Sequence, residues 1–141
     1  MTVYLDTSAV LKLVIDEVES TELARTLTRF GADGEILVAS MLLYTELHCA
    51  ARRRSGAMIP ARTINSVLAA INLVDLARDD LMVAAALPGR LRSADAIHLA
   101  TAIRLRADVF VAYDRELVAA AEEAGLSVAS PGRADSEGDL R

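Results

Sequence analysis

The sequence contains no tryptophan, one cysteine and only 4% aromatic residues among its 141 positions. Because Cys49 is alone, no intrachain disulfide can form, which favours a reducing compartment. No apolar run approaches the ~18 residues of a membrane-spanning helix. The charge of Asp6 interrupts the first apolar stretch, and no basic segment precedes it, so we expect no signal peptide. These absences predict a soluble, cytoplasmic protein without a membrane partner.

Apolar residues make up 53% of the chain, which argues against disorder and predicts a core of Leu, Val, Ile and Ala. A chain of this length favours one domain that buries roughly two thirds of its unfolded surface. From Pro131 onward the residues are small, polar and charged. We therefore expect a single domain over residues 1–131 and a disordered tail over 132–141.

The formal net charge of −5 at first counts against a nucleic-acid partner, because phosphates repel carboxylates. A carboxylate site for divalent metal ions would add negative charges that the bound ion offsets. Net charge therefore does not decide the question.

Runs of β-forming residues alternate with segments of helical periodicity. Strands are expected over residues 2–5, 35–39, 72–75, 108–112 and 126–129. Helices are expected over residues 9–15, from 20 to 30, from 40 to 54, 60–70, 79–88, 93–106 and 114–124. This alternation predicts an α/β domain with a mostly parallel sheet of four to five strands.

Asp6 and Asp114 each follow a predicted strand, where ligand sites of parallel sheets lie. The simpler interpretation makes each one a helix N-cap, since Asp is a favoured capping residue. The two interpretations are compatible, because a capping side chain can also face a shared metal ion.

Glu46 is the most informative acid, because its helical neighbours are apolar and an unpaired carboxylate among them is costly. Either an Arg from elsewhere in the fold or a metal ion would compensate its charge. The sequence leaves these alternatives open.

Asp95 lies in the first turn of a predicted helix, where the helix dipole favours an acid. The helix is apolar around most of its circumference, so Asp95 could instead face a cleft. His98 follows three residues later and can share that face. For His98 a packing or supporting role is favoured over metal ligation.

Several classes of site are missing from the sequence. No Cys or His spacing predicts zinc, no Gly-rich loop predicts phosphate binding, and no Gly-x-Ser-x-Gly segment predicts a hydrolase nucleophile. The cluster 52–54 of three Arg ends a helix, which explains it without a ligand. Arg92 and Arg115 flank the acids and are better candidates for RNA phosphate contacts.

Four segments, in this order, resemble the motifs of PIN-domain ribonucleases, and in particular of the VapC toxins of bacterial toxin–antitoxin pairs. They are Val3-Tyr-Leu-Asp6-Thr-Ser-Ala9, Thr45-Glu46-Leu47, Ser93-Ala-Asp95-Ala-Ile-His-Leu-Ala100 and Asp108-Val-Phe-Val-Ala-Tyr-Asp114-Arg-Glu-Leu117. Each motif alone is weakly specific, but the order and spacing match from residue 3 to about residue 131.

The resemblance implies a three-layer α/β/α fold with Asp6, Glu46, Asp95 and Asp114 as catalytic and metal-binding residues around Mg²⁺ or Mn²⁺. It implies endonucleolytic cleavage of structured RNA, such as tRNA or rRNA, by a metal-activated water. It also implies a homodimer, a small VapB-like antitoxin partner, and a region 55–90 that varies with substrate.

Two rival classes remain. A metal-dependent phosphatase or phospho-receiver also places acids at strand ends, but a phosphatase of the haloacid-dehalogenase type needs Asp-x-Asp where this chain has Asp6-Thr-Ser8. A receiver needs a Lys after the last strand, and the only Lys is Lys12. A catalytically silent binding module is the other rival, and only an assay separates it from an enzyme.

Overall fold

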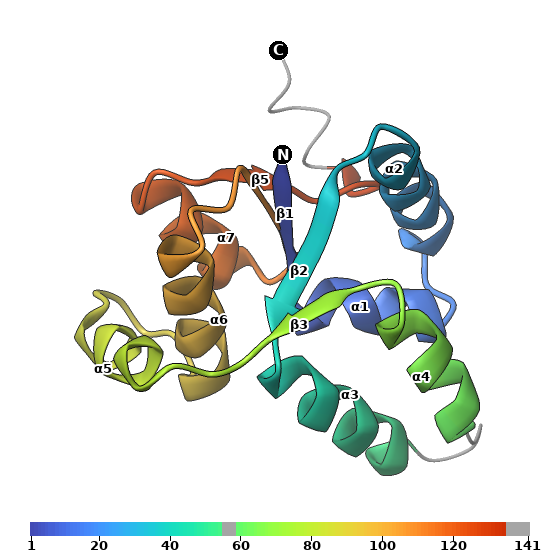
Figure 1. Cartoon of the computed structure of the whole chain (residues 1–141), viewed down its shortest axis with the longest axis horizontal. Helices are drawn as coiled ribbons and strands as arrows, with labels where there is room; N and C mark the ends of the chain where they lie inside the picture. Colours follow the sequence, from blue (N-terminus) through green and yellow to red (C-terminus); the bar gives the residue numbers. More distant parts are fainter. Residues whose placement is uncertain (55–58, 135–141) are drawn as a thin grey trace.

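A computed structural model describes residues 1–54 and 59–134 (Figure 1). Its strands are β1 (Thr2–Leu5), β2 (Ile36–Ser40), β3 (Asn72–Val74), β4 (Val109–Val111) and β5 (Ser127–Ala129). Its helices are α1 (Thr7–Val14), α2 (Ser20–Ala32), α3 (Leu42–Arg53), α4 (Ala61–Leu68), α5 (Arg78–Ala86), α6 (Ser93–Arg104) and α7 (Arg115–Glu123). Residues 135–141 of the expected tail fall outside the described residues.

The five strands form one sheet in the order β3-β2-β1-β4-β5, and every neighbouring pair is parallel. The α/β class and the parallel sheet are therefore confirmed. The first strand lies in the centre of the sheet, flanked by β2 and β4. Because all strands run the same way, their carboxyl ends meet at one edge.

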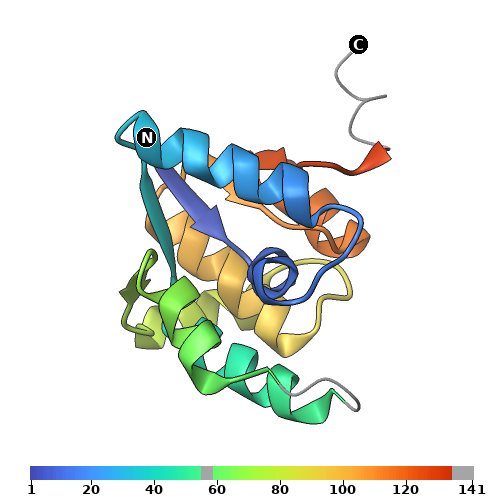
Figure 2. The same ribbon diagram turned by 90° about the vertical axis from the view of Figure 1, so that its right-hand side faces the viewer.

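Side-chain alternation along the strands divides the core into two layers. From β1, Val3 and Leu5 enter one apolar cluster, while Tyr4 enters the other. The first cluster is covered by α1, α2, α3 and α4, and the second by α6 and α7 (Figures 1 and 2). The expected three-layer α/β/α arrangement is thus confirmed.

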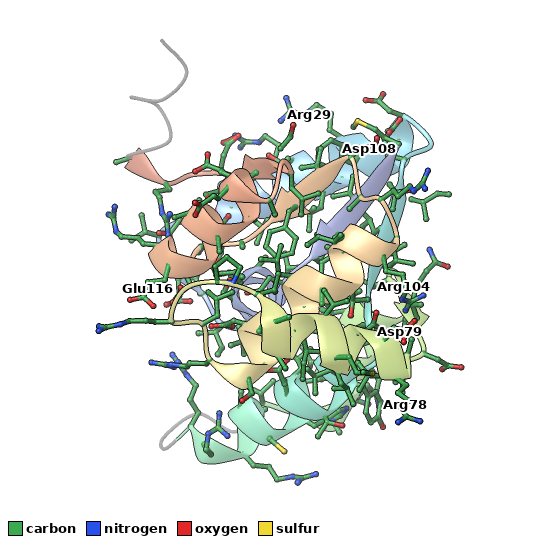
Figure 3. The ribbon with its side chains drawn as sticks, turned by 90° about the vertical axis from the view of Figure 1, so that its left-hand side faces the viewer. Arg29, Arg78, Asp79, Arg104, Asp108 and Glu116 are labelled. Carbon is green, nitrogen blue, oxygen red and sulfur yellow. The ribbon has the colours of Figure 1, made fainter. Side chains whose placement is uncertain are left out.

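The helix α5 is held against α6 by an ion pair between the buried Asp80 and the exposed Arg104. Arg104 donates from Nε to Asp80 Oδ1 at 2.7 Å and from a terminal nitrogen to Asp80 Oδ2 at 3.0 Å. Asp80 is 1% exposed and also accepts a hydrogen bond from the Ala77 amide. Figure 3 shows Arg104 beside Asp79, on the first turn of α5. The pair fixes the segment between β3 and α6, which carries no sequence motif.

Three residues that the sequence pattern favours as helix N-caps, namely Ser40, Asp79 and Ser93, do not hold that position in the structure. Asp79 lies inside the first turn of α5 rather than at its N-cap, which is Ala77. Ser93 begins α6, whose N-cap is Arg92. The N-cap of α3 is Met41, one residue after Ser40, although the Ser40 hydroxyl still accepts a hydrogen bond from the Leu42 amide. Among the described helices, none is long and apolar enough to cross a membrane.

Candidate active site

The acids singled out in the sequence come from four different elements. Asp6 directly follows β1, and Asp114 lies three residues after β4. The Asp6 amide donates to the Val111 carbonyl at 3.0 Å, so the two neighbouring strands stay paired up to this point. Figure 3 shows Glu116, in the first turn of α7, far from Asp108 at the other end of β4. The acid-bearing turns thus lie at the carboxyl edge of the sheet.

Asp6 is 2% exposed and caps α1. Its Oδ2 atom accepts hydrogen bonds from the Ser8 amide at 3.0 Å and from the Ser8 hydroxyl at 2.6 Å. Its Oδ1 atom is buried and has no hydrogen-bond partner among the described residues. A buried carboxylate oxygen without a donor is unfavourable, and binding a cation is one way to satisfy it.

Ser8 connects the two acid-bearing turns. While its hydroxyl donates to Asp6, the same oxygen accepts a hydrogen bond from the Tyr113 amide at 3.1 Å. The adjacent residue, Asp114, is exposed and caps α7 by accepting from the Leu117 amide at 3.0 Å. The capping interpretation of Asp6 and Asp114 is therefore correct, and it leaves a second oxygen on each carboxylate.

Glu46 projects from α3, and one of its oxygens is doubly hydrogen-bonded. Oε1 accepts from the Thr7 hydroxyl at 2.7 Å and lies 2.6 Å from His98 Nε2. Burial favours the neutral carboxyl, but contacts with His98, the Thr7 hydroxyl and the charge of Arg53 outweigh it and lower the pKa of Glu46. Glu46 therefore carries its charge in the folded protein. Its hydrogen-bonding partner is a His, which neither alternative from the sequence anticipated.

Asp95 has the opposite electrostatic environment. Burial, followed by the charges of Asp6, Asp114 and Glu46, raises the pKa of Asp95 to about 6. The charges of all three other acids act on Asp95, so the four acids lie close enough to influence one another. Because carboxylates that repel one another need a counter-charge, this site favours a cation.

The described residues contain no group of three or more His, Cys, Asp or Glu side chains already arranged around one point as metal ligands. The donor chemistry nevertheless fits Mg²⁺ or Mn²⁺, because every candidate ligand is a carboxylate oxygen. Mg²⁺ keeps several waters and is bound through one or two carboxylates, so it does not require a closed protein cage. The unpartnered Oδ1 of Asp6 and the raised pKa of Asp95 are the two features that support such an ion.

The two basic candidates flank this site in the chain. Arg92 is the exposed N-cap residue of α6, three residues before Asp95. Arg115 is exposed in the first turn of α7, directly after Asp114. Their positions allow contact with a polyanion that approaches the acids, and their role remains a prediction.

Sequence reasoning missed Tyr4, Thr7 and Ser8 as part of the site. Tyr4 resembles an ordinary strand residue, and Thr7 and Ser8 entered the sequence analysis only as part of the first motif. The Tyr4 hydroxyl lies 2.7 Å from His98 Nδ1 and accepts from the Ser40 amide at 3.0 Å. A polar residue in an otherwise buried strand position was the available signal.

Comparison with protein families finds the PIN domain model over residues 3–123. Among curated proteins, ribonuclease VapC47 of Mycobacterium tuberculosis is 37% identical over 135 residues, covering 92% of this chain and 97% of the relative. Ribonuclease VapC35 of the same organism is 39% identical over 142 residues, covering 94% and 98%.

Solved structures show the same fold at lower identity. The chain is similar to VapBC2 from Rickettsia felis bound to a promoter DNA fragment, with a TM-score of 0.74, 12% identity and coverage of 92% and 98%. It is also similar to VapC20 of M. tuberculosis, a toxin that cleaves the sarcin–ricin loop, with a TM-score of 0.68, 17% identity and coverage of 92% and 99%. At these identities the likeness shows the fold alone.

Proposed function

The chain belongs to the PIN-domain family, as a member of the VapC type, and from this premise we propose that it is a metal-dependent endoribonuclease and the toxin of a toxin–antitoxin pair. Its relatives at 37% and 39% identity, which it matches over almost their full length, are ribonucleases. The proposal extends that activity to this chain.

One observation carries the metal dependence. The acids form a cluster in which the charges of Asp6, Asp114 and Glu46 all raise the pKa of Asp95 and one buried oxygen of Asp6 has no donor among the described residues. Such a cluster binds divalent cations through hard oxygen ligands. We propose that Asp6, Asp95 and Asp114 are ligands to Mg²⁺ or Mn²⁺ and that Glu46 completes the set. When bound, the ion would activate a water for attack on a phosphodiester and stabilise charge on the leaving oxygen.

The residues of the chain supply position and charge. Ser8 holds the Asp6 carboxylate by one oxygen, and Thr7 and His98 hold the Glu46 carboxylate by one oxygen. No side chain needs to act as nucleophile, which fits the missing Ser or Cys motif. Arg92 and Arg115 are proposed to contact RNA phosphates on either side of the cleaved bond, since the acids themselves repel the backbone.

The substrate and the partners that we propose for this chain rest on its similarity to known proteins. A similar structure is named as cleaving the sarcin–ricin loop, a structured RNA, so we propose tRNA or rRNA as the substrate class. Several similar structures are complexes of toxin with antitoxin, which supports a small VapB-like antitoxin as the partner of this chain. We further propose a homodimer that acts in the bacterial cytoplasm.

The decisive experiment uses protein purified free of partner and incubated with total tRNA and rRNA in Mn²⁺ or in excess EDTA. Asp95→Asn is the active-site variant. Asp79→Asn is its matched control, since it removes an exposed carboxylate from the first turn of another helix. Wild type and the control should cleave only with metal, while Asp95→Asn should lose at least tenfold. Cleavage that persists in EDTA would refute the metal mechanism, and no cleavage by pure wild type would favour a silent binding module.

A further inference from the structure

His98 is completely buried, and each of its ring nitrogens is hydrogen-bonded to a side chain of another element. Nδ1 lies 2.7 Å from the Tyr4 hydroxyl of β1, and Nε2 lies 2.6 Å from Glu46 Oε1 of α3. The ring also contacts Tyr4 edge-on, with centroids 5.8 Å apart. His98 therefore links the centre of the sheet to an acid of the candidate active site.

The direction of each hydrogen bond follows from the donors at the two ends of this chain. The Ser40 amide can only donate, so the Tyr4 oxygen accepts from it at 3.0 Å. Besides the Ser40 amide, His98 Nδ1 is the hydrogen-bond partner that the described structure gives this hydroxyl, so the Tyr4 proton is directed to Nδ1 and Nδ1 accepts. An imidazole that accepts at Nδ1 carries its proton at Nε2, where it faces the Glu46 carboxylate. Thr7 donates to the same Oε1 atom.

We propose that Tyr4 and His98 are positioning residues that hold Glu46 in its working orientation, an inference that rests on the ribonuclease function proposed above. Both donors converge on Oε1, so Oε2 is the oxygen left to face a bound ion or water. The tautomer of His98, set by Tyr4, determines that the ring offers a proton to Glu46 instead of a lone pair. A lone pair there would repel the carboxylate and turn it away.

Packing alone does not explain this arrangement. Tyr4 stacks on Phe110 with ring centroids 5.5 Å apart, a contact that a Phe at position 4 would make equally well. The hydroxyl adds nothing to that stacking, but it is the acceptor for Ser40 and the donor for His98. Outer partners of this kind fix the orientation and protonation of groups that bind metal or substrate.

The test compares single-atom and whole-ring changes with matched controls. Tyr4→Phe removes only the hydroxyl, His98→Gln keeps a donor near the Nε2 position, and His98→Leu keeps bulk without any donor. The controls are Tyr113→Phe, whose hydroxyl donates to the Pro131 carbonyl at 2.6 Å, and His48→Gln, whose ring nitrogen bonds Asn65 at 3.1 Å. Neither control side chain touches Glu46 in the described structure.

We expect Tyr4→Phe and His98→Leu to lower kcat for RNA cleavage at least tenfold with KM changed less than twofold, in line with the loss of outer-shell partners. His98→Gln should recover a large part of the kcat lost in His98→Leu. Both controls should cleave like wild type. Kinetics are measured well below each melting temperature, so that unfolded protein does not contribute. The proposal would be overturned if Tyr4→Phe had the same kcat as Tyr113→Phe. It would also be overturned if His98→Gln were as inactive as His98→Leu.

A second readout does not depend on activity. In the His48→Gln background, His98 is the only histidine, so its two ring ¹⁵N shifts and their couplings can be assigned without ambiguity. We expect a proton on Nε2 and none on Nδ1, and a shift of Nδ1 on Tyr4→Phe. A proton on Nδ1 would overturn the positioning proposal even in an active enzyme. An inactive wild type with the expected tautomer would instead refute the proposed function and leave the hydrogen-bond chain established.

Discussion

Neutralising Asp95 should stabilise the metal-free protein, and the gain should appear as the pH rises. Burial and the charges of Asp6, Asp114 and Glu46 raise the pKa of Asp95 to about 6, from 3.8 for an unperturbed Asp. The folded state therefore holds this proton more tightly than the unfolded state. The contribution of this proton to the unfolding free energy is fully present below the unfolded pKa. It falls between about pH 4 and pH 6, as Asp95 loses its proton in the folded state, and is absent above that range. Asn does not ionise, so the Asp95→Asn variant does not lose unfolding free energy in this pH range.

The magnitude follows from the two pKa values. A difference of about 2 corresponds to roughly 3 kcal/mol for a fully buried group. Asp95 is only partly buried, so solvent screening reduces the penalty to roughly 1 kcal/mol. Against this, a carboxylate in the first helical turn gains about 0.3–1 kcal/mol from the helix dipole, which Asn forfeits. Asp79→Asn, in the first turn of α5, measures that second effect separately.

The assay is urea unfolding in EDTA from about pH 4 to about pH 7, for wild type and both variants. Relative to Asp79→Asn, Asp95→Asn should gain roughly 1 kcal/mol of unfolding free energy across this range. Excess Mn²⁺ should reverse the order at neutral pH, because only wild type and Asp79→Asn keep the full ligand set. A difference that does not change with pH, or a steady loss for Asp95→Asn, would show that Asp95 is an isolated helix-start residue.

Three further changes test other parts of the structure. Asp80→Asn should destabilise the fold by about 2 kcal/mol at neutral pH in urea unfolding, because it leaves Arg104 without its buried partner. Burial raises the pKa of Asp80, but the Arg104 hydrogen bonds outweigh it and lower that pKa, so the stabilisation should disappear as the pH falls below about 4. Glu46→Gln should lower RNA cleavage at least tenfold but change the metal-free unfolding free energy by only about 1 kcal/mol, because Gln can still accept from His98. Asp6→Asn should abolish the rise in melting temperature that Mn²⁺ gives wild type, and an undiminished rise would remove Asp6 from the ligand set.

The sheet was predictable because its strands are short apolar runs between helix signals. Each of the five expected strands overlaps an observed one, with ends shifted by at most one or two residues. The edge on which Asp6 and Asp114 lie was predictable for the same reason, since consecutive β-α units imply parallel strands with their carboxyl ends together. The placement of β1 in the centre was not predictable, because residues 2–5 alone do not reveal which strands pair with them.

Helix starts were predicted less well, because several acids compete for the same local roles. The sequence pattern begins the helix α5 at Asp79, and Asp80 follows it directly. The structure uses Asp80, which accepts from the Ala77 amide and also binds Arg104 from α6. That second contact joins residues 24 positions apart, beyond the reach of any local pattern.

Glu46 shows why the sequence could propose a site acid without revealing its hydrogen-bond partners. The sequence framed a choice between a buried Arg and a metal ion, because each would offset a charge on an apolar helix face. The structure shows a third arrangement, in which the Thr7 hydroxyl donates to Glu46 Oε1 and His98 Nε2 lies 2.6 Å from the same oxygen. An Arg partner would have cancelled the charge, whereas the tautomer of His98 proposed above donates a hydrogen bond from Nε2 and leaves the negative charge on the carboxylate. The hydrogen bonds of Glu46 are therefore no argument against a cation, and its charge stays available at the second oxygen. Residues 46 and 98 lie on separate helices, so the periodicity of neither helix could reveal this pair.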